Sequence, residues 1–342
     1  MIDSRHNYQM NVSPLSVVKN WPFKRSVSAT STISPYADYA LGIDVSRYQY
    51  VNYQALKGIV DFVFCKCSQG SWWIDPLFSV HVQGFHDIGI PVMAYHYWEC
   101  DDYLQYGAQW YDRIPPDKDG QLLNLLHALE HKNIYGLFMD SEQTGNPDPM
   151  WSVTALCNFM PRLDVALRNL GDTKSVRFNA GKFFFGDYSG EWHYNMAKTQ
   201  YMALNAKKAS NDRPYDIWSA KYPYATGAVT TTWENLKSNL LPATTAVSSL
   251  GSPNAWTFWQ FSGDKFKLPG VFNSESMTTL SAVDLNFFNG TKTALYKLIG
   301  FAEGNEENPE EPPVVDTELE ERVSVLETKV DKVVTLFNSW NK

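Results

Sequence analysis

The sequence predicts an irregular α/β barrel followed by a C-terminal coiled-coil helix. Short apolar runs alternate with helical segments from about Ala37 to Ala302, a pattern typical of an α/β barrel. Several of these runs are continuously apolar, as expected of strands buried on both faces. Beyond them, apolar residues recur at heptad spacing in residues 317–342.

The predicted barrel elements follow one another in regular alternation only in the first half. The strands are expected at Ala40–Val45, Phe62–Ser68, Pro91–Trp98, Gly136–Asp140, Ser175–Asn179, Asp216–Ala220, Trp256–Phe261 and Val283–Phe287. The helices are expected at Leu77–Ile88, Tyr103–Asp112, Gln121–His131 and Ser152–Leu170. Because little helix separates the last strands, we expect the barrel to be irregular there.

Three segments lie outside the predicted barrel of residues 37–302. Residues 1–36 form an irregular arm, and residues 303–316 form an acidic, proline-rich linker. Residues 317–342 follow as the coiled-coil helix, whose apolar positions are Leu319, Val323, Leu326, Val330, Val333, Phe337 and Trp340. This heptad favours a dimer or trimer of the chain, and packing of the helix back onto the barrel is the alternative.

Charge and composition narrow the range of partners. Residues 303–342 account for −7 of the net charge of −8, so residues 1–302 together carry a net charge of only −1. Such a body has no basic surplus for nucleic acid or an anionic membrane. Aromatic residues make up 15% of the chain, which suits sugar binding although most of them are expected in the core.

The N-terminal segment and the cysteines bear on the compartment. Residues 1–36 lack the apolar core of a signal peptide, and no run of about 18 apolar residues predicts a membrane span. The spacing of the four cysteines matches no common disulfide or zinc motif, and we expect buried free thiols. We expect no metal and no cofactor, synthesis in the cytoplasm, and export by a route other than the N-terminus.

Asp140 and Glu142 are the strongest catalytic candidates. They end the apolar run Gly-Leu-Phe-Met, and residues i and i+2 of a strand point to the same face, roughly 7 Å apart. Glycoside cleavage needs one carboxyl group that holds a proton and a second that stays charged. Two surface acids in a solvated loop are the alternative.

Further motifs extend this pattern along the chain: Gly-Ile-Asp-Val-Ser at 42–46, Lys-Cys-Ser-Gln-Gly at 66–70, Tyr-His-Tyr at 95–97, Trp-Gln-Phe-Ser at 259–262 and Val-Asp-Leu-Asn at 283–286. In this order and spacing, the segment from about Leu41 to Phe288 resembles the family 25 glycoside hydrolases, the Chalaropsis-type lysozymes of bacteria and phages.

The resemblance implies a barrel of five strand–helix pairs and three final strands. It implies hydrolysis of the β-1,4 bond between N-acetylmuramic acid and N-acetylglucosamine in bacterial peptidoglycan. Glu142 matches the general acid/base and Asp140 its partner, while Asp44 and Asp284 match two further acids of the groove. Positions that resemble substrate contacts are Lys66, Tyr95, Tyr97, Trp218, Tyr222 and Gln260. Gln69-Gly70 and Gln49-Tyr50 stand where the family usually has Glu-Gly and Gln-Gly, and neither departure removes a predicted catalytic carboxylate.

Two mechanisms fit these residues. In one, Glu142 protonates the leaving oxygen while Asp140 orients the 2-acetamido group of the sugar, which acts as the nucleophile. In the other, the site inverts through an activated water. A catalytically inactive cell-wall-binding or structural virion module on the same barrel is the alternative function. The arm, linker and coiled coil favour a phage lytic or virion-associated protein that acts on the wall after lysis or as part of a phage particle.

Overall fold

The barrel is closed by pairing between its first and last strands. The computed structural model describes residues 34–107, 109–142, 149–171, 182–207, 213–225, 227–242 and 256–301, which fall in one compact unit that ends at Phe301. Its eight barrel strands in the described residues are β1 (Leu41–Val45), β3 (Phe62–Gln69), β5 (Val92–Tyr97), β6 (Gly136–Asp140), β7 (Phe184–Gly190), β8 (Asp216–Ala220), β10 (Phe258–Asn273) and β11 (Leu280–Phe288).

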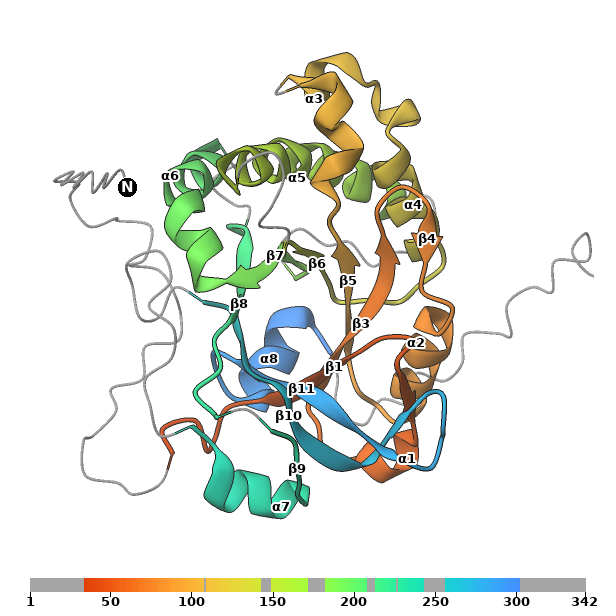
Figure 1. Ribbon diagram of the computed structural model, residues 1–342, viewed down its shortest axis with the longest axis vertical. Helices are drawn as coiled ribbons and strands as arrows, with labels where there is room; N and C mark the ends of the chain where they lie inside the picture. The colour runs from red at the N-terminus through yellow and green to blue at the C-terminus, as the bar shows by residue number, and fades with distance from the viewer. Residues whose placement is uncertain are drawn as a thin grey trace, which may run out of the picture. The chain divides into compact units, whose positions relative to one another are not determined.

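Strands β1 to β10 of this ring run parallel to their neighbours, and β11 is antiparallel to both β10 and β1. Pairing of β1 with both β11 and β3 leaves no free edge in the ring (Figure 1). The predicted irregular α/β barrel is therefore confirmed. Three short strands extend the sheet: β2 (Gln49–Val51) and β9 (Val229–Thr230) pair with β10, and β4 (Trp73–Ile74) pairs with β3.

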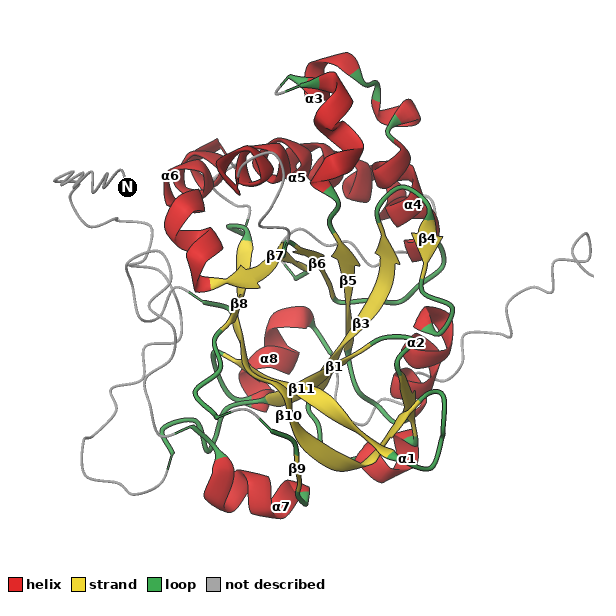
Figure 2. Ribbon diagram, in the orientation of Figure 1, coloured by secondary structure: helices red, strands yellow, loops and turns green. Residues whose placement is uncertain are grey.

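Helices cover the outside of the first half of the barrel. They are α1 (Tyr53–Leu56), α2 (Phe78–Asp87), α3 (Trp110–Arg113), α4 (Gly120–Leu129), α5 (Pro149–Gly171) and α6 (Glu191–Lys207). The last strands are joined by little helix, as predicted, because only β9, α7 (Trp233–Asn235) and a π-helical turn (Leu236–Leu240) are described between β8 and β10 (Figure 2). No helix among the described residues is long and apolar enough to cross a membrane.

Two apolar clusters lie on the two faces of the strands. The outer cluster packs the strands against the helices and includes both Cys65 and Cys67. The inner cluster fills the barrel with aromatic rings, among them Phe64, Phe258 and Trp218. Helix α8 (Lys292–Ile299) contributes Leu295, Tyr296 and Ile299 to this inner cluster. The barrel is thus a filled core and not a pore, as in other barrels of this size.

One predicted strand and one predicted helix differ from the structure. The fifth barrel strand is Phe184–Gly190, and the segment predicted for it, Ser175–Asn179, lies outside the described residues. The helix predicted at Tyr103–Asp112 is divided into a 3-10 turn (Cys100–Tyr106) and α3. Gly107 ends the turn with a φ of 71°, a left-handed conformation that a continuous α-helix does not contain.

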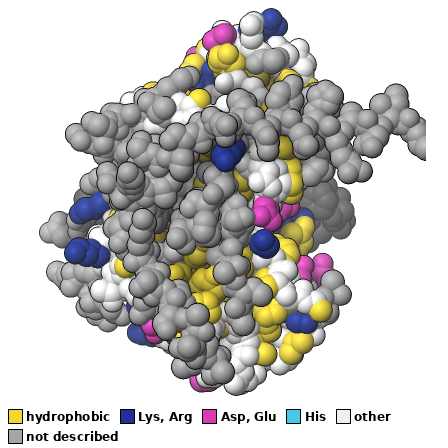
Figure 3. Space-filling view, turned by 90° about the vertical axis from the view of Figure 1, so that its left-hand side faces the viewer, with side chains coloured by type: hydrophobic (Ala, Val, Ile, Leu, Met, Phe, Trp, Pro, Cys, Tyr) yellow, Lys and Arg dark blue, Asp and Glu magenta, His cyan; other side chains and the backbone are white. Residues whose placement is uncertain are grey.

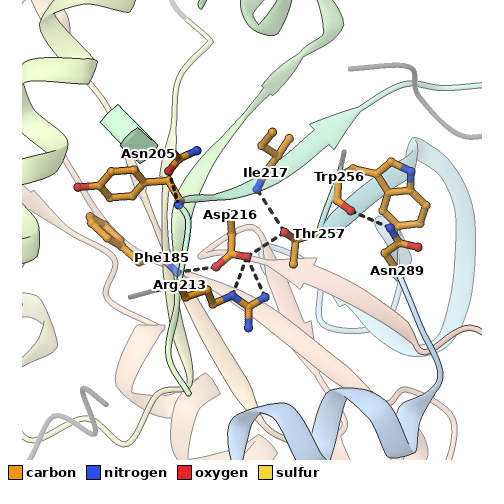
Figure 4. Close-up of polar contacts among 9 residues, drawn as sticks. Phe185, Asn205, Arg213, Asp216, Ile217, Trp256, Thr257 and Asn289 are labelled. Carbon is orange, nitrogen blue, oxygen red and sulfur yellow. Dashed lines mark hydrogen bonds and ion pairs between the residues drawn. The ribbon is translucent and has the colours of Figure 1, made fainter. Parts of the chain in front are cut away.

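A buried polar network ties β7, β8 and β10 together at the start of β8 (Figure 4). Asp216 accepts hydrogen bonds from the backbone N–H of Phe185 at 3.0 Å and from the Thr257 hydroxyl at 2.9 Å, and it forms an ion pair of 2.9 Å with Arg213. Next to it, a Cβ on Gly186 would lie 1.8 Å from the Asp216 carbonyl oxygen. The strands therefore approach each other at a distance that only glycine permits.

The segments predicted outside the barrel fall almost entirely on residues that the structure does not describe: residues 1–33 of the arm, the linker at 303–316 and the helix at 317–342. Tyr36, predicted as part of the arm, packs on the barrel with its ring 5.1 Å from that of Phe287. On the face shown in Figure 3, two groups of dark-blue Lys or Arg side chains lie next to each other at the left edge, and the other dark-blue groups lie singly.

Candidate active site

Four acidic residues meet at one end of the barrel. Asp44 and Asp140 lie at the carboxyl ends of the parallel strands β1 and β6, and Glu142 follows Asp140 by two residues. Asp284 lies on antiparallel β11 as the direct partner of Asp44 in the sheet. The carboxyl ends of the strands are where barrel enzymes carry their active sites.

Asp44 is held by amide groups. Its Oδ2 atom accepts hydrogen bonds from Gln260 Nε2 at 2.9 Å and from Asn286 Nδ2 at 2.7 Å. The same Gln260 nitrogen lies 3.4 Å from Asp284 Oδ2, and the backbone N–H of Asp264 donates to Asp284 Oδ1 at 2.8 Å. The two amides therefore fix the orientation of Asp44, and Gln260 links it to Asp284; Asp44 is buried and Asp284 is partly buried.

Two tyrosines connect this amide to Glu142. The Tyr188 hydroxyl donates to Gln260 Oε1 at 2.7 Å, and the Tyr222 hydroxyl donates to the same oxygen. The Tyr188 hydroxyl also lowers the pKa of the nearby Glu142 carboxyl group. Tyr188 and Gln260 thus link the surroundings of Glu142 to Asp44.

Burial is the largest influence on the protonation of Asp44 and Asp284. It raises the pKa of Asp44 to about 6, although the hydrogen bonds from Asn286 and Gln260 lower it. It raises the pKa of Asp284 well above its usual range, and the negative charge of Asp44 adds to the rise. Two buried carboxyl groups that face each other ionise together only at a high cost, so this pair retains a proton above the usual range of aspartate.

Asp140 and Glu142 form a second coupled pair. Burial raises the pKa of Asp140 well above its usual range, and the charge of Glu142 raises it further. Burial also raises the pKa of Glu142, while the positive charge of Lys66 lowers the pKa of both. Glu142 is the exposed member, whereas Asp140 is 8% exposed and its Oδ1 atom has no hydrogen-bond partner among the described residues. The pair therefore combines a proton that is retained above the usual range of a carboxyl group with a buried oxygen that is free to accept a hydrogen bond.

The six predicted substrate contacts lie at different depths. As described above, Gln260 hydrogen-bonds to Asp44, and Tyr222 hydrogen-bonds to Gln260. Tyr222 is 49% exposed. Lys66 Nζ lies 4.9 Å from the ring of Tyr97, which is the sheet partner of Asp140. These four residues surround the carboxyl groups.

Tyr95 and Trp218 lie deeper. The Trp218 ring is 2% exposed and stacks on Phe64 at 3.8 Å, while its indole N–H donates to Asn286 Oδ1 at 2.7 Å. Tyr95 packs edge-on against Trp218 at 5.9 Å. Trp218 is thus a support beneath the carboxyl groups, reaching Asp44 through Asn286.

The surroundings of His96 and of the four cysteines indicate a structural role for these residues. His96 is fully buried between the Ser68 hydroxyl at 2.8 Å and Gln121 Oε1 at 3.1 Å, and burial lowers its pKa to about 4. All four cysteines are free and buried, as predicted. Within the described ranges, no group of three or more His, Cys, Asp or Glu side chains could hold a metal ion.

A cavity of about 560 Å³ lies away from the carboxyl groups. It is lined by residues of β2, α1 and α2, including Tyr50, Tyr53 and His81, and by Phe272. None of the four acidic residues lines it. We therefore place the candidate site at the four carboxyl groups, which can carry out the chemistry, and not at this cavity, which none of them lines.

Sequence reasoning missed Tyr188 and did not single out Asn286. Tyr188 lies on β7, where no strand was predicted, so nothing in the sequence aligned it with Asp140, its sheet partner. Asn286 had a usable signal, since it follows Asp284 by two residues and therefore points to the same face of β11.

The comparisons with known proteins agree with the sequence motifs. Residues 43–119 match the family model "Glycosyl hydrolases family 25". Among solved structures, the bacterial lysozyme from Streptomyces coelicolor is 19% identical, with a TM-score of 0.46 over 77% of this chain and 99% of that one. The catalytic domain of endolysin ply40 from bacteriophage P40 of Listeria monocytogenes is 21% identical, with a TM-score of 0.44 over 77% and 98%.

A family 25 glycosyl hydrolase from Bacillus anthracis is 20% identical, with a TM-score of 0.44 over 76% of this chain and 93% of that one. A comparison with curated protein sequences finds no match. The family match confirms the resemblance predicted from the motifs and the predicted class of enzyme, a glycoside hydrolase.

Proposed function

We propose that this barrel is a muramidase, on the premise that residues 43–119 match the model of the family 25 glycosyl hydrolases. It cleaves the β-1,4 bond between N-acetylmuramic acid and N-acetylglucosamine in bacterial peptidoglycan. The observation that carries the proposal is the pairing of a buried carboxyl group, Asp140, with an exposed one of raised pKa, Glu142, at the carboxyl end of a barrel strand.

Glu142 is proposed as the general acid and base. Its raised pKa favours the protonated form that the leaving oxygen needs, and its exposure leaves it accessible to a glycan. Once the proton has been transferred, the resulting carboxylate is stabilised by the charge of Lys66 and by the nearby Tyr188 hydroxyl, both of which lower its pKa.

Asp140 is proposed as the partner in substrate-assisted catalysis. Its unpartnered Oδ1 atom accepts the N–H of the 2-acetamido group, whose carbonyl oxygen then attacks the anomeric carbon as the bond to the leaving oxygen breaks. The hydrogen bond donated by the acetamido N–H favours the ionised form of Asp140, and its negative charge then stabilises the oxazolinium ion, which water hydrolyses. Asp44 and Asp284 line the groove beside this pair.

The biological setting proposed for this activity is a phage lytic or virion-associated protein. The support is the order of segments in the sequence, with an arm, a barrel, an acidic linker and a heptad helix. A catalytically inactive wall-binding module is the rival function. The exposure and raised pKa of Glu142 favour the enzyme, because a binding module has no use for two coupled carboxyl groups.

Loss of turbidity of Gram-positive cell walls, with mass analysis of the released sugars, tests the proposal. A muramidase releases chains that end in reducing N-acetylmuramic acid. Reducing N-acetylglucosamine ends would assign a different glycosidic bond, and binding to walls without release of sugar would favour the inactive module.

A further inference from the structure

Two cations at the rim of the candidate site share one indole ring. The guanidinium carbon of Arg47 lies 5.3 Å from the centre of the Trp73 ring, and Lys66 Nζ lies 5.4 Å from the same ring. Arg47 also lies 4.9 Å from the ring of Tyr48. Cation–π contacts at exposed positions contribute only about 0.5–1 kcal/mol, so these rings orient the two cations without neutralising them.

The charge of Lys66 is already engaged by the candidate site. It lowers the pKa of both Asp140 and Glu142, and its ammonium group donates to Gln69 Oε1 at 3.1 Å. Lys66 therefore balances the catalytic pair. Arg47 is the second cation of this rim, and its charge lowers the pKa of Asp75, which is not one of the four candidate catalytic acids.

The Arg47 guanidinium makes one described polar contact, a hydrogen bond of 3.0 Å to the Tyr48 hydroxyl. The nearby acid, Asp75, is occupied by the backbone: its Oδ2 atom accepts the N–H of Arg47 at 2.9 Å and its Oδ1 atom accepts the N–H of Leu77 at 2.8 Å. Asp75 thus fixes the loop that carries Arg47 and leaves most of the guanidinium donors available. Such a planar fork of donors matches the two oxygens of a carboxylate.

The position of Arg47 relates it to a bound glycan. It lies three residues after Asp44 in the loop that follows β1, and Trp73 on β4 pairs with Gln69 at the end of β3. The neighbouring aromatic side chains are open to solvent, since Tyr48 is 58% exposed and Trp72 is 70% exposed. A basic group among exposed flat rings, beside carboxyl groups that cleave sugars, is suited to a glycan that carries its own negative charge.

We propose that Arg47, oriented by Trp73 and Tyr48, binds a carboxylate of the muramyl residue or of its peptide stem. This inference rests on the proposed muramidase function and adds to it a determinant of substrate specificity. The lactyl ether of N-acetylmuramic acid ends in a carboxylate, and the stem peptides attached to it carry others. N-acetylglucosamine carries none, so Arg47 discriminates walls from neutral N-acetylglucosamine polymers.

The test combines a variant with a modified substrate. Arg47→Gln raises the KM for native wall glycan by about 5- to 20-fold, the effect of losing a charge-assisted hydrogen bond. Wall glycan whose carboxyl groups have been converted to amides raises the KM of the wild-type chain by a similar factor. The variant shows no further rise on the amidated substrate, because the same interaction is already lost. Lys57→Gln, which removes an exposed cation after α1, is the matched control with a wild-type KM on both substrates.

Removal of the stem peptides distinguishes the two sources of the carboxylate. If the Arg47→Gln effect persists on peptide-free glycan, the lactyl carboxylate is the ligand, and if it disappears, the ligand is in the stem. An unchanged KM for Arg47→Gln on native glycan, or an equal penalty on native and amidated glycan, overturns the inference while leaving the muramidase proposal intact. A wild-type chain that releases no sugar from native walls overturns the proposed function itself.

Discussion

Glu142 is the exposed member of a group of carboxyl groups in which Asp44 and Asp140 are buried and Asp284 is partly buried. This difference divides the proposed roles, because a group that exchanges a proton with substrate must be reached by it. The buried members act through their charge and their hydrogen bonds. At the scale of single residues, the site is therefore organised by burial, which is the largest cause of every raised carboxyl pKa in it.

Replacing Glu142 with Gln is expected to abolish wall lysis and to preserve the fold. The amide is nearly isosteric but has no acidic proton, and general acid catalysis typically contributes about 10²- to 10⁴-fold to the rate. The measurement is the rate of release of reducing sugar, with thermal unfolding as the control for folding. Asp140→Asn should be severely impaired as well. A folded Glu142→Gln variant with a wild-type rate would refute its assignment as the acid.

Asp44 should make the stability of the chain depend on pH. Its pKa of about 6 in the folded chain exceeds the value of about 3.9 for an unperturbed aspartate. The folded state binds this proton more tightly, so the stabilising contribution is complete below about pH 4 and is lost as the pH rises through about 6. The loss is on the order of 3 kcal/mol.

Asp44→Asn should remove this dependence, because an amide does not ionise. Its oxygen can accept the hydrogen bonds of Gln260 and Asn286, and its nitrogen can donate to Asp284. Melting temperatures measured from pH 4 to pH 8 should therefore favour the variant increasingly above pH 5, while its activity on walls falls. Parallel melting curves for the two proteins over this range would contradict the raised pKa.

At the scale of elements, β7 and β8 are the junction on which the site depends. Strand β7 carries Tyr188, and β8 carries Trp218, which reaches Asp44 through Asn286. The network around Asp216 fastens the start of both strands, at the end of the barrel opposite to the carboxyl groups. Its contribution is therefore to stability and not to chemistry.

Asp216→Asn is expected to lower the free energy of unfolding by about 2–4 kcal/mol, because it removes the negative charge that pairs with the largely buried Arg213 guanidinium. Urea unfolding measures the change, and kcat at a temperature well below unfolding should be unaffected. Thr257→Val is the milder comparison, since it removes one neutral hydrogen bond worth about 1 kcal/mol. A urea midpoint equal to that of the wild type would show that the ion pair does not hold the junction.

At the scale of the whole molecule, the proposed heptad helix governs assembly. Its apolar stripe would expose a sizeable surface on a single helix, so association with other copies is the favoured outcome. Removing residues from Asn305 onward should give a monomer that hydrolyses soluble wall fragments at the wild-type rate but holds intact walls more weakly. Light scattering measures the mass of both proteins. A full-length chain that is monomeric at micromolar concentration would refute the coiled coil and leave the enzyme unaffected.

The sequence by itself determined the barrel and its acidic residues. Strands β6 and β8 have the predicted bounds, because each is an apolar run that ends at a charged or small residue and needs no distant contact to be recognised. Asp44, Asp140 and Glu142 were found because they follow such runs, and the carboxyl ends of parallel strands meet at one end of a barrel.

Only the tertiary structure decided what surrounds them. Strand β7 contains Gly186, Asp187 and Ser189, residues that disfavour strands locally. Its position is imposed by the close approach of the Asp216 backbone to Gly186 and by the buried pair of Asp187 and His193, 3.0 Å apart. Tyr188 reaches Gln260, 72 residues away, for the same reason. The bonds that orient the carboxyl groups join distant strands, and local sequence patterns carry no information about which strands the closed barrel brings together.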